Sequence, residues 1–179
     1  SINDPAGYWR NNVEVSKRLF ARYPETRILY ASSSSAYEPD LNPYAASKYV
    51  VEEAAERNVD TLGMRFHTVY SESPRAKMFF DKLLNDTLEY TTNHQRDFIH
   101  LEDLTDGIIL LMDKDLTGNV DIGTGNCVRI QDIRPDLPVK LNTVGERTKT
   151  QANTHLMDKL GFRPKYTVDG FLKEQGFKK

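Results

Sequence analysis

The sequence predicts an α/β fold, built on a parallel sheet that carries a smaller lobe. Helix-like and strand-like segments alternate along the 179 residues, and such alternation favours parallel strands joined by crossover helices. A run of serines directly follows a strand-like apolar segment, and ligands in open α/β sheets bind at such strand ends. The segments of the second half are less regular, which indicates the smaller lobe.

The first half is predicted to run helix, strand, helix and strand. Residues 12–23 form a helix with one apolar stripe, which Pro24 ends. The stripe consists of Val13, Val15, Leu19 and Phe20. Residues 27–31 are a short apolar run of strand type, and residues 60–66 are another. Between them, Asn42-Pro43 suits the N-cap and first turn of a helix that continues to about residue 57.

The second half is predicted to consist of shorter elements. Helices are expected over residues 77–84, 102–112, 154–160 and 168–174, and extended segments over 88–92, 97–100 and 119–122. The last extended segment ends in Gly123-Thr124-Gly125. Because Val128 stands where a dinucleotide-binding fingerprint needs its third glycine, these glycines are interpreted as a tight turn. Asp97 and Asp103 are expected to cap or brace helices and to take no part in chemistry.

Composition argues against several function classes. The net charge of −2 provides no basic field that would attract nucleic acid. Cys127 is the single cysteine, and the four histidines have no paired spacing, so neither a disulfide framework nor a metal site is expected. The longest apolar run, residues 108–112, is far too short to span a membrane. Without a signal-peptide pattern, the expected location is the cytoplasm.

Tyr44 and Lys48 lie four residues apart on one predicted helix, and therefore on one face. A lysine ammonium ~4 Å from a phenol, at an effective dielectric of ~20, favours the phenolate by about 4 kcal/mol. That energy corresponds to at most about 3 units in the pKa of the phenol. Such a phenol can exchange a proton with a substrate hydroxyl or ketone while a serine at the strand end holds the oxygen. The trio suits oxidation or reduction at an alcohol carbon.

Taken alone, this tyrosine–lysine spacing is common on solvated helix faces, and serine runs are common in polar turns. The position of both at the end of a strand favours the functional interpretation.

Further segments follow in a recognisable order. They are Tyr8-Trp9-Arg10-Asn11-Asn12-Val13, Ala31-Ser32-Ser33-Ser34, Gly63-Met64-Arg65-Phe66-His67-Thr68-Val69-Tyr70, Gln95-Arg96-Asp97-Phe98-Ile99-His100-Leu101-Glu102-Asp103-Leu104, Asp121-Ile122-Gly123-Thr124-Gly125-Asn126, Gly145-Glu146-Arg147 and Leu160-Gly161-Phe162-Arg163-Pro164.

Together these segments resemble the extended short-chain dehydrogenase/reductase family, in its nucleotide-sugar epimerase/dehydratase branch. The resemblance covers most of the chain and implies a Rossmann-like parallel sheet with a smaller α/β substrate-binding lobe. Two residues depart from the family's "LRYFNVYG" pattern, because Thr68 replaces the usual asparagine and Ser71 the usual glycine.

The resemblance also implies the site residues. The catalytic group would be Ser33, Tyr44, Lys48 and Asn12, with Ser34 as a second candidate for the serine. Contacts with NAD, or alternatively NADP, would come from Ser32, Tyr44, Lys48, Arg65 and Phe66, although Arg65 could instead be a buried support. Substrate contacts would come from Ser34, Thr68, Arg96 and Arg147, of which Arg147 could equally be a surface residue. The planar guanidinium of Arg96 suits a pyrophosphate.

The implied activity is that of an NAD(P)-dependent nucleotide-sugar epimerase or keto-sugar reductase with Tyr44 as acid/base. Ser34 and Ser35 stand where dehydratases and decarboxylases of this branch carry acidic residues, which disfavours those reactions. A truncated or degenerate relative that binds nucleotide without turnover remains an alternative, as does a regulatory or scaffolding relative. A homodimer through residues 12–23 and 44–57 is also implied.

The family's order of segments implies a division of the chain. Residues 1–70 would be the C-terminal part of the NAD-binding Rossmann domain, with Ser33, Tyr44 and Lys48. Residues 71–179 would be mainly the substrate-binding lobe, with 97–123 returning to the Rossmann domain. The family's Gly-rich β–α–β start does not occur in this sequence, so we expect the chain to be part of a larger enzyme.

Overall fold

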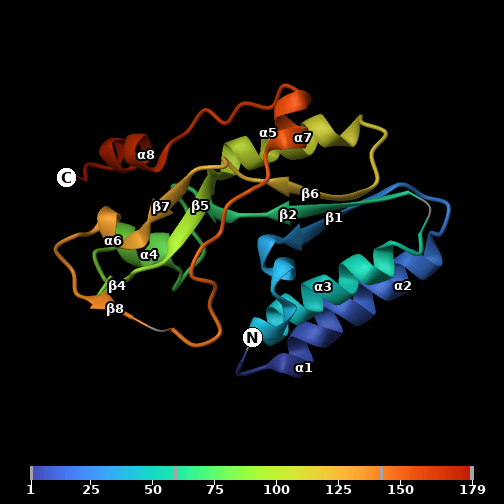
Figure 1. The fold of residues 1–179 in the computed structure, drawn as a ribbon, viewed down its shortest axis with the longest axis horizontal. Helices are drawn as coiled ribbons and strands as arrows, with labels where there is room; N and C mark the ends of the chain where they lie inside the picture. The colour runs from blue at the N-terminus through green and yellow to red at the C-terminus, as the bar shows by residue number, and fades with distance from the viewer. Residues whose placement is uncertain (1, 59, 142, 178–179) are drawn as a thin grey trace.

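A three-stranded parallel sheet organises the computed structural model, which describes residues 2–58, 60–141 and 143–177. Its strands are β1 (Ile28–Ser33), β2 (Thr61–Phe66) and β6 (Gly118–Ile122), in the order β1-β2-β6 (Figure 1). In the register of the sheet, Ser33 stands opposite Phe66 and Phe66 opposite Ile122. The carboxyl ends of the three strands therefore meet at one edge, and the predicted Rossmann-like sheet is confirmed.

Helices α1, α2 and α3 cover one face of this sheet (Figure 1). The N-terminal helix comprises α1 (Pro5–Tyr8), a π-helical segment (Trp9–Glu14) and α2 (Val15–Arg22). Helix α3 (Pro43–Ala55) begins as predicted, because the Asn42 side chain accepts a hydrogen bond from the Ala45 N–H at 2.9 Å.

The predicted apolar stripe of the N-terminal helix is only half right. Val13 and Phe20 are buried against α3 and β1, whereas Val15 is 53% exposed and Leu19 44% exposed. Two residues along a helix rotate the side chain by about 200°. Val15 therefore points away from the face that Val13 buries, and Leu19 shares its exposed side.

Helices α5 (Leu101–Met112) and α7 (His155–Lys159) cover the opposite face (Figure 1). The core on this face joins strand residues to helix and loop residues. It contains Leu62, Met64, Val120 and Ile122 from the sheet, with Leu104, Leu111, Met157 and Phe162 packed against them. The sequence predicted both helices to within one or two residues of their ends.

The second lobe is built around β5 (Gln95–His100), which pairs in parallel with β3 (Thr68–Tyr70) and antiparallel with β7 (Cys127–Arg129). Helices α4 (Phe79–Leu84) and α8 (Val168–Glu174) enclose an aromatic core. That core contains Tyr70, Phe80, Phe98 and Phe171.

Short elements complete the second lobe. They are α6 (Ile130–Ile133), β4 (Thr91–Thr92) and β8 (Val139–Lys140), of which the two strands pair in parallel. The sequence analysis missed β3, β7, β8 and α6, because elements of two to four residues show no readable periodicity. Within the described ranges, no helix is long and apolar enough to cross a membrane. In the same ranges, no three His, Cys, Asp or Glu residues group as metal ligands.

Candidate functional site

A cavity of about 200 Å³ opens at the carboxyl ends of β1 and β2, between the sheet and the second lobe. Six of the predicted site residues line it, namely Ser33, Ser34, Phe66, Thr68, Arg96 and Arg147. The segment that contains Gly145 and Glu146 closes one side. The predicted substrate residues are thus brought together from four distant parts of the sequence, at the strand edge where ligands of α/β sheets bind.

The serine run divides between this cavity and a buried cluster behind it. Ser33 ends β1 in an extended conformation, and its hydroxyl accepts a hydrogen bond from the Ser35 N–H at 3.2 Å. Ser32 instead donates its hydroxyl to the buried carboxylate of Glu52. Arg65 binds the same carboxylate through Nε at 2.9 Å and Nη2 at 2.7 Å. Ser32 and Arg65 therefore brace α3 against β1 and β2 and do not line the cavity.

Tyr44, Lys48 and Asn12 lie on the α3 side of the cavity without lining it. The Lys48 ammonium donates to the Ala31 carbonyl at 2.8 Å and lies 5.9 Å from the centre of the Tyr44 ring. Burial holds the pKa of Lys48 below its ordinary value. Within the described part of the chain, no residue hydrogen-bonds the Tyr44 hydroxyl. Asn12 donates its Nδ2 to Ser47 Oγ at 2.8 Å, which ties the π-helical segment to α3 beside Lys48.

Two arginines line the cavity. Arg147 donates to the Ser34 carbonyl and to Glu38, both at 2.7 Å, and its side chain is only 17% exposed. Arg96 lies 3.8 Å from the Glu146 carboxylate. Burial, together with the charge of Arg147, holds the pKa of Arg96 below its ordinary value. Two guanidinium groups held close together in one cavity suit a diphosphate.

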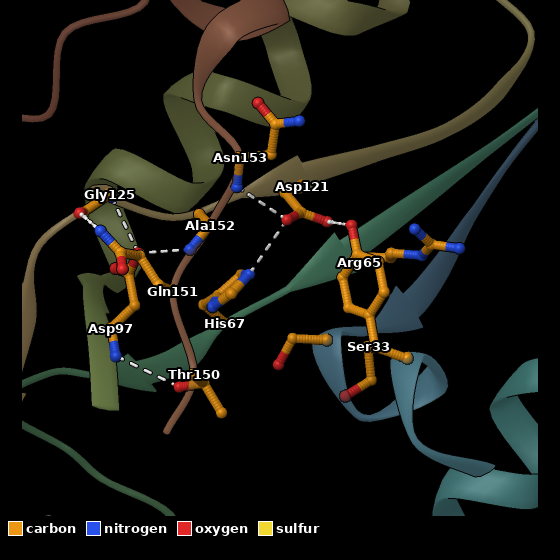
Figure 2. A network of polar contacts seen from close by, with 12 residues as sticks. Ser33, Arg65, His67, Asp97, Asp121, Gly125, Thr150, Gln151, Ala152 and Asn153 are labelled. Carbon is orange, nitrogen blue, oxygen red and sulfur yellow. Dashed lines mark hydrogen bonds and ion pairs between the residues drawn. The ribbon is translucent and has the colours of Figure 1, made fainter. Parts of the chain in front are cut away.

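A buried network that the sequence analysis did not identify lies at the ends of β2 and β6 (Figure 2). His67 Nε2 lies 3.5 Å from Asp121 Oδ2, and both side chains are almost fully buried. Asp121 also accepts hydrogen bonds from the Tyr37 hydroxyl at 3.0 Å and the Asn153 N–H at 2.9 Å. Burial opposes the charge of Asp121, but His67, Asn153 and Tyr37 outweigh it and hold the pKa of this carboxyl below its ordinary value.

Asp97 anchors the loops beside this network (Figure 2). It is fully buried, and its carboxylate accepts hydrogen bonds from the N–H groups of Thr124, Gly125 and Ala152 at 2.8 to 2.9 Å. It therefore braces a turn and a loop, and the prediction that it caps or braces a helix is wrong. Asp103 likewise accepts the N–H groups of residues 165 and 166.

Comparison with known proteins places these features in a family. The model of the NAD dependent epimerase/dehydratase family matches residues 1–123. An uncharacterized protein of Methanocaldococcus jannaschii is 26% identical over 214 residues, which cover 97% of this chain and 66% of the relative. The chain therefore spans slightly less than two thirds of the length of that curated relative.

Solved structures show the same similarity. MoeE5 in complex with UDP-glucuronic acid and NAD is 25% identical, with a TM-score of 0.77 over 92% of this chain and 70% of MoeE5. The UDP-glucuronic acid 4-epimerase from Bacillus cereus, in complex with UDP-glucuronic acid and NAD, shares the fold at 21% identity. Its TM-score is 0.82 over 96% of this chain and 68% of the epimerase. Because the family model covers more than half of its residues, the chain belongs to the NAD-dependent epimerase/dehydratase family.

Proposed function

We propose that this chain supplies the catalytic and substrate-binding part of an NAD-dependent nucleotide-sugar epimerase or keto-sugar reductase. The observation that carries the proposal is that Ser33 and two guanidinium groups, those of Arg96 and Arg147, line one cavity next to the helix of Tyr44 and Lys48. One nucleotide-sugar molecule would then span the cavity, with a carbon of its sugar at Ser33 and its diphosphate at the two arginines. The proposed division of the chain follows the sequence analysis with one adjustment. Strands β3 and β5 belong to the second lobe, so residues 1–66 and 101–123 are on the cofactor side.

The described residues fit an NAD molecule on the α3 side of the cavity. An ammonium group has three donors, and Lys48 uses one of them on the Ala31 carbonyl. The Tyr44 hydroxyl has no partner among the residues that the structure describes. We therefore propose that Tyr44, Lys48 and Phe66 contact the cofactor, whereas Ser32 and Arg65 support it through Glu52. When bound, NAD supplies hydride transfer at a sugar carbon.

The chain's own residues then handle the proton. Tyr44 exchanges a proton between its hydroxyl and the oxygen on the reacting sugar carbon, which Ser33 holds through a second hydrogen bond. The Lys48 ammonium, 5.9 Å from the centre of the Tyr44 ring, places a positive charge beside the group that exchanges the proton. Asn12 is a positioning residue in this scheme, because it contacts Ser47 and thereby holds the turn of α3 that carries Lys48.

A second cavity, of about 230 Å³, offers a place for the nucleoside. Glu146 lines both cavities, so the second continues from the arginine side of the first. The second is also lined by Tyr90 and by Thr91 and Thr92, whose hydroxyl groups are buried without hydrogen-bond partners. The exposed ring of Tyr90 offers an aromatic face on which a nucleobase can stack. We propose that the nucleoside occupies this second cavity.

Two measurements on the full chain test the proposed function. Calorimetry with UDP-glucose, UDP-glucuronic acid and dTDP-glucose should show micromolar to submillimolar binding of at least one. NMR analysis of the same sugars with NAD should show a new epimer or a keto sugar. Binding of nucleotide sugar without binding of millimolar NAD or turnover would support the alternative of a non-catalytic relative. Failure of every nucleotide sugar to bind would overturn the proposal.

Replacing Arg147 with alanine is expected to weaken binding of UDP by about tenfold or more. A hydrogen bond to a charged group contributes about 1.5–3 kcal/mol, and Arg147 is half of the guanidinium pair in the cavity. Calorimetry with UDP measures the effect. Arg163→Ala is the matched control, because that arginine is 67% exposed and lies outside the cavity. Equal affinities of the two variants for UDP would contradict the assignment of the diphosphate to Arg147.

The predicted homodimer belongs to the same proposal. Val15, Leu19 and Tyr23 on or next to α2 and Tyr49 on α3 are each at least 40% exposed, which provides apolar area for helix packing. Light scattering on the chain in solution measures its oligomeric state. The cytoplasmic location stays a prediction from the sequence.

A further inference from the structure

His94 contacts Arg96 but does not itself line the first cavity. It immediately precedes β5, and Arg96 is the second residue of that strand, so strand alternation places both side chains on one side. His94 is only 2% exposed, and its carbonyl accepts the Ile130 N–H at 3.0 Å. The imidazole is therefore held inside the second lobe, next to a guanidinium that does line the cavity.

The contacts of the His94 ring assign its proton. Arg96 Nη2 lies 3.1 Å from His94 Nδ1. A guanidinium only donates hydrogen bonds, so Nδ1 is the acceptor and the proton of the neutral ring is on Nε2. Nε2 then donates to Thr143 Oγ1 at 3.0 Å. Both ring nitrogens thus have a partner, and the contact with Arg96 requires that Nδ1 carries no proton.

The charges around the ring agree with a neutral His94. Among the described residues, the charged groups that face it are Arg96 and Glu146, whose Oε2 lies 3.3 Å from Nδ1. Burial and the charge of Arg96 outweigh Glu146 and hold the pKa of His94 below its ordinary value. Glu146, which is 53% exposed, instead accepts the Thr143 hydroxyl at 3.3 Å. The imidazole is therefore neutral near pH 7.

A neutral acceptor orients Arg96 without cancelling its charge. Arg96 Nη1 donates to the Gln95 carbonyl at 2.9 Å, and Nη2 donates to His94, so neutral groups fix both ends of the guanidinium. A carboxylate in the place of the imidazole would bind the guanidinium more strongly, but it would compete with a diphosphate for the same donors. A guanidinium has five N–H donors, and these two contacts leave the others for a ligand in the cavity.

We propose that His94 is a positioning residue for the diphosphate site, which holds the Arg96 guanidinium in the cavity through Nδ1 and does not touch the ligand. The inference rests on the proposed function and adds to it a residue that acts only through Arg96. It predicts that the acceptor at Nδ1, and not the bulk of the ring, determines how well a nucleoside diphosphate binds.

Two substitutions of similar size separate this role from a structural one. Asparagine can place a neutral oxygen near the position of Nδ1, and leucine has no acceptor there. In calorimetry with UDP, or with dTDP if the wild type binds only that, His94→Leu is expected to weaken binding by about fivefold. His94→Asn should retain affinity to within about twofold. The exposed His155, replaced in the same two ways, provides the controls.

A double-mutant cycle tests whether His94 acts through Arg96. Arg96→Ala alone should weaken binding of the same diphosphate, because a guanidinium of the cavity is lost. In that background His94→Leu should change the affinity by less than about twofold, since a positioning residue has no effect once its partner is absent.

Several outcomes would overturn the assignment. Equal losses of affinity with leucine and asparagine would show that the ring matters for packing and not as an acceptor. An undiminished effect of His94→Leu in the Arg96→Ala background would show that His94 does not act through Arg96. In both cases the proposed function stands while this assignment fails. If wild-type protein binds neither UDP nor UDP-glucose, and likewise neither dTDP nor dTDP-glucose, the proposed function fails and this assignment fails with it.

A measurement on the ligand-free protein does not depend on the stability of the His94 variants. Histidine labelled with ¹⁵N reports the protonation of each ring nitrogen by NMR. Near neutral pH, His94 should show an unprotonated Nδ1 and a protonated Nε2. Its pKa should rise in Arg96→Ala, because a charge that lowers it is removed. A protonated Nδ1 near neutral pH, or a His94 pKa that Arg96→Ala leaves unchanged, would overturn the assignment.

Discussion

Tyr44→Phe should abolish turnover while leaving substrate binding intact. The substitution removes the hydroxyl that exchanges the proton and keeps the ring that packs edge-on against Tyr8, with ring centres 5.8 Å apart. General acid–base groups contribute about 10²–10⁴ to the rate, so kcat is expected to fall by at least a hundredfold. The hydroxyl has no hydrogen-bond partner among the described residues, so its loss should not destabilise α3.

The control for this prediction lies on the same helix. Tyr49 is 40% exposed and does not line the cavity, so Tyr49→Phe should leave turnover and binding unchanged. Turnover is measured by NMR on the nucleotide sugar that binds best, and binding by calorimetry on the same samples. If Tyr44→Phe keeps more than a tenth of the wild-type turnover, another group must carry the proton.

The site residues that lie close together in the sequence could be predicted from it. A helix fixes the relation of Tyr44 to Lys48 by its geometry alone, and the Asn42 cap marks where that helix begins. Strand β1 could be predicted because its apolar run is short and is followed by polar residues. Ser33 then follows at the end of the strand, beside the N-terminal turn of α3. Features of the neighbouring sequence were therefore sufficient to predict these site residues.

The network of His67 could not be predicted in the same way. His67 and Asp121 are far apart in the chain, and only the pairing of β2 with β6 brings them together. Each looks ordinary in the sequence, because a single histidine or aspartate after a strand is common. Glu52 escaped attention for the same reason, although it engages both Ser32 and Arg65. Such pairs depend on sheet order, which periodicity does not reveal.

Asp97→Ala should be strongly destabilising, with a loss of about 3–5 kcal/mol in the free energy of unfolding. Its carboxylate is fully buried and accepts three backbone N–H groups and the Thr124 hydroxyl. Alanine would leave these donors buried without an acceptor, in the turn after β6 and the loop that contains Ala152. Chemical denaturation followed by circular dichroism measures the change.

The comparison with Asp97→Asn tests the reason for the effect. Asparagine keeps one acceptor oxygen, but its NH₂ group must face backbone N–H groups where the second oxygen stood. We therefore expect about half the loss caused by alanine. Asp113→Ala, at an exposed position at the end of α5, should change the free energy of unfolding by less than about 0.5 kcal/mol. If Asp97→Ala lowers the free energy of unfolding no more than Asp113→Ala does, the turn after β6 keeps its conformation without the carboxylate. If the substitutions at Asp97 also weaken UDP-glucose binding, the carboxylate fixes a loop on which the cavity depends. That loop contains Ala152, whose N–H the carboxylate accepts, and Thr150, which lines the cavity.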